Sequence, residues 1–388
     1  MKERLFKIIL LLPTLVMVSC KSDHKHKSYL SIDSITINNL IKEVIEEINN
    51  NYADEITREK LEEGAINGML AFLDEHSLYI NQEEFSAFNQ YARGTYLGMG
   101  IEVKQTKDGI EIVSIIDESP AFTAGLRNGD IITHIGEKEV GNIPVRDMYL
   151  KLNSDASPEM LLSVTRNKNE KFNVVVKKLV IQLQTVKVNY IQNIATIKVT
   201  YFNEESVSSL KKIIKNINQK KNINGVIIDL RNNPGGILDQ AIGVADLFLG
   251  DSTKIVDFKS RNVDETRSIY AKGKDILSGV PMAILIDRNS ASGAELVAAA
   301  LGENKRAIIL GEKSYGKGSL QTIFPIPGKG AIKLTTAFFY TPNGNKINNN
   351  GITPDIAIND GEEIMTRAID LLLGLSALDV PLVPSSNS

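Results

Sequence analysis

The sequence predicts a multidomain α/β protein, and three observations lead to that prediction. The chain has 388 residues, enough for about two or three domains. Its composition, with 43% hydrophobic and 23% charged residues, is typical of globular proteins. The spacing of its apolar residues changes from helical to short alternating strands, and then to strands that alternate with helices.

The N-terminus has the pattern of an export signal. Basic residues precede the apolar run 8–18, which has the length of a signal-peptide hydrophobic region and is shorter than the about 20 residues of a spanning helix. Cys20 follows Met-Val-Ser, which resembles the lipobox of bacterial lipoproteins, although methionine stands where leucine is usual. We therefore expect a lipoprotein-type signal peptide at 1–20 and a polar tether at 21–34. The alternatives are an uncleaved signal anchor or an ordinary signal peptide.

This interpretation implies an exported protein that is lipid-anchored to a bacterial membrane and faces the periplasm or the cell exterior. Because Cys20 is the only cysteine, we expect no disulfide within the chain, no thiol nucleophile and no cysteine metal site. The net charge is −3, and no long basic run occurs outside the N-terminus, so nucleic acid is not an expected partner. We expect neither a metal nor a cofactor.

Two small domains are expected after the tether. Residues 35–93 form an N-terminal helical domain, because apolar residues recur at helical spacing in the runs 41–48 and 61–72. Residues 94–181 then read as short strands separated by glycine, proline and asparagine turns, which predicts a small β-rich domain.

Residues 182–360 are predicted to form the α/β core. The continuous apolar runs 225–230, 281–287 and 306–310 are typical of strands buried on both faces of a parallel sheet. Amphipathic segments between them predict covering helices. Residues 361–388 are expected to form a C-terminal helix and tail.

The stretch ILGEKSYGKGSLQ begins like a phosphate-binding loop, because Gly311 is followed after four residues by a second glycine and Lys317. Such a loop needs Ser or Thr directly after the lysine, and then a helix. Here Gly318 follows the lysine, and residues 319–324 alternate as a strand does. A nucleotide site is therefore disfavoured, and Lys317 is either a solvated turn residue or a functional lysine.

Two serines, Ser290 and Ser292, follow the strand 281–287 and begin an alanine-rich helix. A helix N-terminus favours a developing negative charge. The pair Ser292 and Glu295 also fits a capping box, which is a purely structural device. None of the four histidines lies in residues 182–388, so a Ser-His-Asp triad confined to the core is excluded. Neither serine lies in a G-x-S-x-G motif.

The remaining way to activate a serine is a lysine that burial keeps neutral. Lys317 is the candidate, because its flanking glycines let other backbone approach closely. In a strand, positions 317 and 321 would share a face, so the Gln321 amide can hold and orient the lysine amine. The role requires a Lys317 pKa well below its ordinary value of about 10.4.

The stretch DLRNNPGG leaves the end of a predicted buried strand and ends in Gly235 and Gly236. Loops at the carboxyl ends of α/β strands build active sites. A Gly-Gly turn can offer a bare backbone N–H to an oxyanion. A simple helix-entry turn is the structural alternative.

The motifs SASGAE, GKGSLQ, DLRNNPGG and TPNGNKINNNGITPDI together resemble those of the carboxyl-terminal processing, or tail-specific, serine peptidases. The likeness spans about residues 35–358, because YADEITREKLEEGAINGMLAFLDEHSLYI resembles that family's helical segment and GTYLGMGIEV begins a likeness to its PDZ domain. The resemblance implies a ClpP/crotonase-like catalytic core with a PDZ domain and an N-terminal helical segment. It also implies a serine endopeptidase that recognises apolar C-terminal tails of exported proteins.

The resemblance assigns roles to individual residues. It implies Ser292 as the nucleophile, Lys317 as the general base and Gln321 as the third member. It implies an oxyanion hole formed by the N–H of Gly293 and one from the turn at Gly235 and Gly236, which the sequence does not distinguish.

A second site is expected in the PDZ domain. Glycine-rich backbone can capture a C-terminal carboxylate, while the following strand pairs with the tail of the substrate. The expected partners are therefore protein substrates bound through their C-terminal tails, and homo-oligomer formation stays open. A glycine hairpin without a ligand is the alternative. The loop residues are Leu97, Gly98, Met99, Gly100 and Ile101.

One departure from the family pattern is Glu75, which stands in LDEHS where proline is usual, and we expect it to concern the helical domain alone. His76 and His134 are interpreted as structural. The alternative function is a non-catalytic PDZ lipoprotein scaffold that binds protein C-termini, but it leaves the Ser-Lys-Gln set unexplained.

Overall fold

The computed structural model describes residues 34–116, 118–140, 158–167, 169–220, 223–262, 266–359, 361 and 363–377. They fall into two compact units, one that ends at Gly64 and one that begins at Ala65. Helix α1 (Ser34–Asn51) lies in the first unit, and α2 (Arg58–Ala71) spans the boundary. Cys20 and residues 21–33 lie outside the described part of the chain. None of the described helices is both long and apolar enough to cross a membrane.

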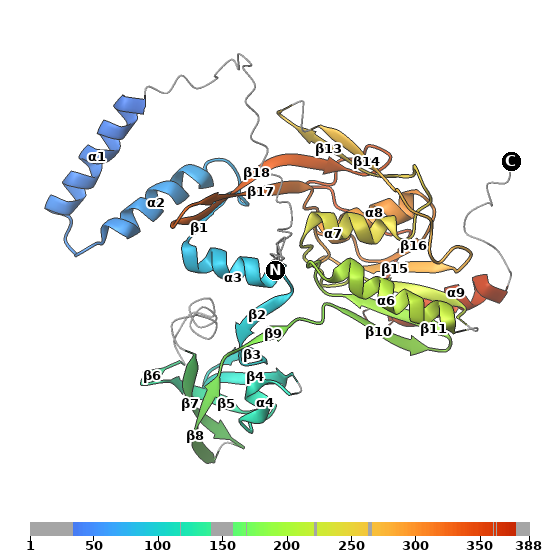
Figure 1. Cartoon of the computed structure of the whole chain (residues 1–388), viewed down its shortest axis with the longest axis horizontal. Coiled ribbons are helices and arrows are strands. Elements are labelled where there is room, and N and C mark those ends of the chain that lie inside the picture. The colour runs from blue at the N-terminus through green and yellow to red at the C-terminus, as the bar shows by residue number, and fades with distance from the viewer. Residues whose placement is uncertain are drawn as a thin grey trace, which may run out of the picture. The chain divides into compact units, whose positions relative to one another are not determined.

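A small β-rich domain follows helix α3 (Gln82–Ala92), as the sequence predicts (Figure 1). Its sheet has the order β3-β4-β5-β7-β8, and β6 pairs with β5. Strand β2 (Thr95–Gly98) pairs with β9 (Leu179–Gln182) where the chain enters and leaves the domain. The remaining elements are β3 (Ile101–Thr106), β4 (Gly109–Ile115), α4 (Pro120–Thr123), β5 (Ile131–Ile135), β6 (Lys138–Glu139), β7 (Glu159–Arg166) and β8 (Glu170–Lys177).

The α/β core contains a six-stranded sheet with the order β10-β11-β12-β15-β16-β19. Strand β10 is antiparallel to β11, and the other neighbours are parallel. The three predicted buried strands are confirmed as β12, β15 and β16. The strands are β10 (Val186–Ile191), β11 (Ile194–Val199), β12 (Gly225–Asp229), β15 (Met282–Ile286), β16 (Ile308–Gly311) and β19 (Ile356–Ala357).

Helices cover both faces of this sheet (Figure 1). Side chains alternate along a strand, so Val226 and Ile228 point to one face and Ile227 to the other. The first face packs against α6 (Ser206–Gln219), α7 (Leu238–Asp246) and α8 (Gly293–Glu303), and the second against α9 (Glu363–Ala377). Because both faces are buried, the strands read as continuous apolar runs.

A second sheet has the order β1-β18-β13-β14, and β17 pairs with β18. Strand β1 (Leu78–Ile80) comes from the segment that the sequence assigns to the helical domain, yet it pairs with β18 (Gly330–Tyr340). Leu78 lies opposite Lys333, so the loop that precedes β1 is held beside β18, the hairpin partner of the strand that follows the Lys317 loop. The other strands are β13 (Lys254–Ser260), β14 (Arg267–Tyr270) and β17 (Ser319–Ile326).

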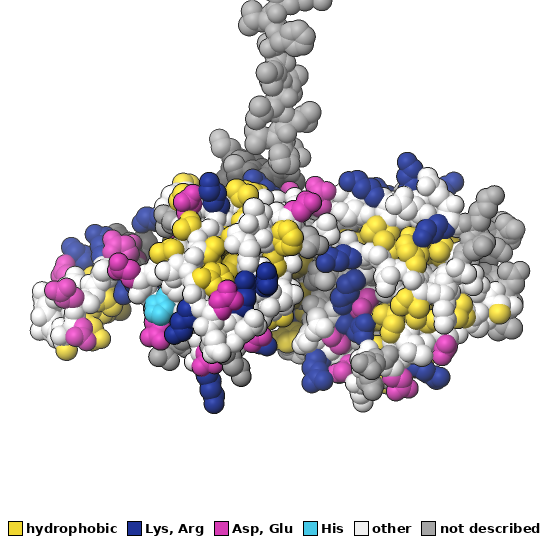
Figure 2. Space-filling model, turned by 90° about the horizontal axis from the view of Figure 1, so that it is seen from below, with side chains coloured by type: hydrophobic (Ala, Val, Ile, Leu, Met, Phe, Trp, Pro, Cys, Tyr) yellow, Lys and Arg dark blue, Asp and Glu magenta, His cyan; other side chains and the backbone are white. Residues whose placement is uncertain are grey.

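The surface carries charges of both signs. On the face drawn in Figure 2, Lys and Arg side chains are interspersed with Asp and Glu side chains. This is the distribution expected of solvated faces on a chain whose net charge is −3.

Arg306 is a buried charge that holds the turn before β15. Its side chain is 6% exposed and its guanidinium donates to the Asp275 carboxylate at 2.6 Å and to the carbonyls of Leu277 and Val280 at 2.9 and 3.1 Å. Arg306→Met should lower the free energy of unfolding by about 3 kcal/mol, because these acceptors lose their donors inside the protein. Urea unfolding curves, monitored by circular dichroism, measure this change in the free energy of unfolding.

Arg288→Met is the matched control. The Arg288 side chain is 77% exposed in its ion pair with Glu312, so its loss should change the unfolding free energy by less than about 0.5 kcal/mol. Equal effects of the two substitutions would contradict the structural role of Arg306.

Candidate active site

Ser292 lies in the turn between β15 and α8. Its φ of 54° and ψ of −113° belong to a region that a residue with a side chain rarely adopts. A strained strand-to-helix turn of this kind is typical of nucleophilic serines, even though the G-x-S-x-G motif is absent here. At the start of α8 the N–H groups of Ala294 and Glu295 are bonded to Ala291 and Ser292, which leaves the Gly293 N–H and the helix dipole to favour negative charge at this turn.

The neighbouring serine, Ser290, has a different environment. It is fully buried, and its hydroxyl donates to the Leu230 carbonyl at 2.9 Å and accepts the Asp287 N–H at 2.9 Å. These contacts occupy its single donor and fix it as a link between two loops. Ser292 is partly exposed, so the geometry favours Ser292 over Ser290 as the reactive hydroxyl.

The Gly-Gly turn lies against Ser292. Strands β12 and β15 are adjacent and parallel, so the loops that follow them leave the same edge of the sheet. A Cβ added to Gly235 would lie 2.8 Å from the Ser292 Cβ and 3.0 Å from the Gly293 nitrogen. Gly235 has a φ of +108°, so this close approach requires glycine.

Hydrogen bonds distinguish the two glycines of this turn. The Gly235 N–H donates to the Asn233 side chain at 2.8 Å, and the Gly235 carbonyl accepts the Phe202 N–H at 2.9 Å. In a trans peptide the next N–H points away from that carbonyl, so the Gly236 N–H is directed away from Phe202. Gly236 is therefore the glycine whose N–H can join that of Gly293 in an oxyanion hole.

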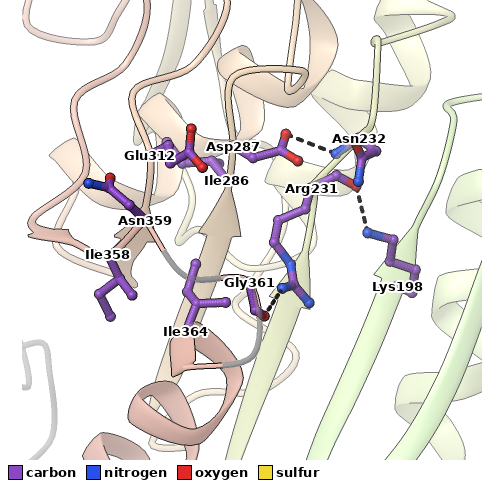
Figure 3. A pocket seen from close by; sticks show the side chains of 10 residues that line it. All are labelled: Lys198, Arg231, Asn232, Ile286, Asp287, Glu312, Ile358, Asn359, Gly361 and Ile364. Atoms are coloured by element: carbon purple, nitrogen blue, oxygen red, sulfur yellow. Dashed lines mark hydrogen bonds between the residues drawn. The ribbon is translucent and has the colours of Figure 1, made fainter.

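Arg231 anchors the base of the same loop at a cavity of about 350 Å³ (Figure 3). It donates to the Gly361 carbonyl at 2.9 Å and makes paired bonds to Asp229 at 2.8 and 2.9 Å. Burial opposes ionisation of Asp229, but Arg231 and Lys198 hold its pKa below the ordinary value. The cations at this cavity are therefore already paired, and they serve to fix the loop.

A buried carboxylate, Glu295, joins the Ser292 turn to the Lys317 loop. One oxygen accepts the N–H groups of Ser292 and Lys317, both at 2.8 Å. The other accepts the Gly316 N–H at 2.6 Å and the Ser314 hydroxyl at 2.5 Å. Glu295 is fully buried, and burial raises its pKa while these bonds oppose the rise. The expected capping role therefore exists, and the same carboxylate also holds the lysine loop.

The glycines beside Lys317 let another loop cross it closely. A Cβ on Gly318 would lie 2.2 Å from the Asn348 nitrogen, and the Gly316 carbonyl accepts the Asn349 N–H at 2.8 Å. Strand β17 follows this loop where a phosphate-binding loop would continue into a helix. The geometry therefore does not suit a nucleotide phosphate.

Lys317 is half-buried, and its electrostatic surroundings lower its pKa. Burial is the largest cause, and the positive charge of Lys333 on β18 adds to it. The carboxylates of Glu295 and Glu75 oppose the shift without cancelling it. A lysine general base requires such a lowered pKa, because the neutral amine is the form that accepts a proton.

The loop before β1 lies beside Lys317, which the sequence analysis missed. Asp74, Glu75 and His76 line a cleft of about 510 Å³ together with Gly316. Burial and the charge of Lys317 lower the pKa of His76. Glu75 acts on the pKa of Lys317, so the expectation that this departure concerns the helical domain alone is wrong. The alternation of residues just after this loop is a weak sequence signal for strand β1, which holds the loop beside Lys317.

Gln321 lies on β17 just after a bulge in its pairing with β18. The strand begins at Ser319, so Lys317 lies before it, and the shared strand face expected for positions 317 and 321 does not exist. The Gln321 amide nitrogen donates to the Ser319 hydroxyl at 2.9 Å and to the Thr335 hydroxyl at 3.2 Å. Its orientation is thus set by these two hydroxyls.

The expected carboxylate-binding loop of the PDZ domain, residues 97–101, connects β2 to β3. Met99 is buried in the domain core, and Gly100 has a φ of +81° with its Cα against Ser119. The loop therefore offers mainly backbone groups, and not side chains, to a bound C-terminus. Strand β3 stands at the end of its sheet, so one of its edges pairs with no other described strand, and peptides can add to edges of this kind.

Comparisons with known proteins agree with this architecture. Residues 193–358 match Peptidase family S41, residues 98–176 match the PDZ domain, and residues 17–84 match the N-terminal domain of the activating protease CtpB. The carboxy-terminal-processing protease of Bartonella bacilliformis is 36% identical over 340 residues, which cover 87% of this chain and 78% of that protein. A probable CtpA-like serine protease of Staphylococcus epidermidis is 29% identical over 352 residues, covering 90% and 71%.

Solved structures support the fold. The photosystem II D1 C-terminal processing protease aligns with a TM-score of 0.52 at 20% identity, covering 87% of this chain and 98% of that one. A putative S41 protease from Bacteroides fragilis aligns with the same TM-score at 14% identity, covering 87% and 97%. On the strength of the curated relative at 36% identity over most of both proteins, the chain belongs to peptidase family S41, as a serine-type carboxy-terminal-processing protease.

Proposed function

We propose that this protease hydrolyses peptide bonds with Ser292 as nucleophile, Lys317 as general base and Gln321 as the residue that orients the lysine. The observation that carries this proposal is the Glu295 carboxylate, which binds the backbone of Ser292 and of Lys317 through the same oxygen. It brings a strained serine and a half-buried lysine of lowered pKa to one point of the fold.

The reaction follows from the chemistry of these groups. Neutral Lys317 takes the proton of the Ser292 hydroxyl as the serine oxygen attacks the scissile carbonyl carbon. The N–H groups of Gly293 and Gly236 donate to the oxyanion. The Lys317 ammonium then protonates the leaving amine, which leaves an acyl-enzyme. Lys317 deprotonates a water molecule, and the resulting attack releases the acyl group and regenerates Ser292.

Substrates are proposed to be captured by their apolar C-terminal tails at the PDZ domain. The open edge of β3 supports this proposal, because a tail can add to it as a further strand while the backbone of residues 97–101 receives the carboxylate. A scaffold without catalysis is not favoured, since it gives no role to the strained Ser292 or to the half-buried Lys317.

Lipid anchoring at Cys20, and with it export to the periplasm or cell exterior, is part of the proposal on the sequence pattern alone. Loss of the Cys20→Ser protein from the membrane fraction would support it, and unchanged fractionation would refute it. Homo-oligomer formation stays a prediction.

Ser292→Ala and Lys317→Ala should each reduce cleavage of an unfolded reporter with an apolar C-terminal tail by at least about a thousandfold, because each removes a group that forms or breaks a bond. A fluorophosphonate probe should label the wild type and not Ser292→Ala. Ser290→Ala is the control and should keep the labelling. Cleavage that survives in Lys317→Ala would remove this lysine from catalysis.

The rate of cleavage should rise with pH through the pKa of Lys317, because only the neutral amine can accept a proton. The lowered pKa places this rise below the ordinary lysine value of 10.5. Lys333→Met should move the rise to higher pH, since the loss of a neighbouring positive charge makes the Lys317 ammonium more stable. Rates measured from pH 5 to 10.5 test the shift.

Two controls accompany this pH profile. His76→Gln removes the other titrating base of the cleft and should leave the rise where it is, because the His76 pKa is already lowered. Lys317→Arg, which cannot become neutral, should lose the activity. A profile that is identical in the wild type, Lys333→Met and Lys317→Arg would refute the lysine base.

Amidation of the substrate's C-terminus should lower kcat/KM by about tenfold or more, because the carboxylate loses its bonds to the PDZ loop. A pair of reporters that differ only in this group measures the effect. Equal cleavage of the reporters with free and amidated tails would refute the proposed capture of the tail by the PDZ domain, and it would leave the peptidase assignment unchanged.

A further inference from the structure

Asn233 joins the Gly-Gly turn to the turn that carries the proposed nucleophile. It is fully buried. Its side-chain oxygen accepts the Gly235 N–H at 2.8 Å, and its side-chain nitrogen donates to the Val199 carbonyl at 2.9 Å. Its backbone carbonyl accepts the Ala291 N–H at 2.9 Å. One residue therefore contacts the end of strand β11, the Gly-Gly turn and the residue before Ser292.

These contacts need a side chain that accepts and donates at the same time. Val199 offers a carbonyl and Gly235 offers an N–H, so its partners fix the direction of the Asn233 amide. An aspartate would lack the donor, and an apolar side chain would leave both backbone groups unpaired inside the protein. The amide anchored at Val199 therefore holds the Gly235 N–H in a fixed direction.

Phe202 holds the same turn from a second side. The Phe202 N–H donates to the Gly235 carbonyl at 2.9 Å, and the Phe202 carbonyl accepts the Ile237 N–H at 2.7 Å. Together with the Asn233 bond, these contacts use the backbone groups on both sides of Gly236. Within the described part of the chain, no partner takes the Gly236 N–H itself. That N–H is therefore available to an oxyanion, and the bonds of its neighbours set its direction.

Asn233 also sets the separation of the two proposed oxyanion donors. Its side chain binds the residue before Gly236, and its carbonyl binds the residue two positions before Gly293. The two loops meet closely here, because a Cβ on Gly235 would lie 3.0 Å from the Gly293 nitrogen. Donors of an oxyanion hole act at about 2.7 to 3.1 Å from the oxygen, so a shift of either loop weakens the stabilisation.

We propose that Asn233 is a positioning residue of the peptidase site, which directs the Gly236 N–H toward the oxyanion and fixes its separation from the Gly293 N–H. The proposal rests on the proposed acyl transfer at Ser292. Asn233 is buried and acts through the two glycines. It also withdraws the Gly235 N–H from the oxyanion, because that N–H already has an acceptor.

Asn233→Ala in the full-length chain tests this role. It removes both side-chain bonds, so kcat per folded molecule should fall about thirtyfold or more, as expected when an oxyanion donor is misplaced. KM should stay within about threefold of the wild type, because the loss is confined to the transition state. The pH at which the rate rises should not move, since no described bond joins Asn233 to Lys317.

Asn233→Ser is the conservative variant. A serine hydroxyl can accept the N–H two residues further on, but more weakly than an amide, so kcat should lie only about three- to tenfold below the wild type. Asn304→Ala is the control. The Asn304 side-chain nitrogen also donates to backbone carbonyls, those of Ala300 and Lys254, at the other end of α8. Its loss should lower the free energy of unfolding and leave kcat unchanged.

An inhibitor separates the oxyanion role from structural support. A peptide aldehyde with the sequence that precedes the cleaved bond places its oxygen in the oxyanion hole when the serine adds to it. Its Ki should rise in Asn233→Ala by the factor by which kcat/KM falls. The Kd of a free tail peptide should stay within about twofold of the wild type, because the PDZ domain is untouched.

Urea unfolding of each variant gives the folded fraction to which kcat is referred. If Asn233→Ala does not fold, the loss of kcat in Asn233→Ser and a matching rise of the aldehyde Ki decide the question. A wild-type kcat or a wild-type aldehyde Ki in the folded variant, while Ser292→Ala is inactive, would overturn the positioning role. Full activity of Ser292→Ala would instead refute the proposed nucleophile, and the role of Asn233 with it.

Discussion

The buried carboxylate of Glu295 is the contact on which the site depends. From Leu296 to Gly302 helix α8 is apolar, and the buried carboxylate of Glu295 is tolerated because three N–H groups and one hydroxyl surround its oxygens. Within the described part of the chain, no lysine or arginine forms a salt bridge with Glu295, and its hydrogen-bond partners are N–H and O–H groups from two loops. Those loops are thereby held at a fixed separation. The contacts that satisfy this one buried carboxylate thus also hold the two main residues of the proposed site, Ser292 and Lys317, in place.

Parallel-strand geometry supplies the rest of the arrangement. Strands β12, β15 and β16 are neighbours in the sheet, and the loops that follow them carry the Gly-Gly turn, Ser292 and Lys317 in that order. Each loop leaves the same edge, so these groups converge although they lie far apart in the chain. The strain at Ser292 is tolerated because the buried helix and the Glu295 bond hold that backbone from both sides.

The sequence predicted the buried strands because strands buried on both faces are continuous apolar runs. The absence of histidines from the core made Lys317 the candidate base, whereas the choice of Ser292 over Ser290 came from the resemblance to the peptidase family. It did not predict that the loop before β1 lies against β18, because that depends on Ser77 meeting Thr335, 258 residues later. A strand of three residues such as β1 has too short a sequence pattern to predict which strand it pairs with. The distinction between Gly235 and Gly236 likewise needed the contacts of Phe202, which spacing does not encode.

The pairing of β1 with β18 also sets when the site can exist during synthesis. Strand β1 is made early, and β18, with which it pairs among the described strands, exists only after residues 330–340 have been made. A nascent chain therefore carries its serine and its lysine before the loop of Asp74 can dock beside them. Completion of the cleft therefore waits until β18 has been synthesised. Until then the chain carries the residues of the proposed site without the loop that lines one side of the cleft.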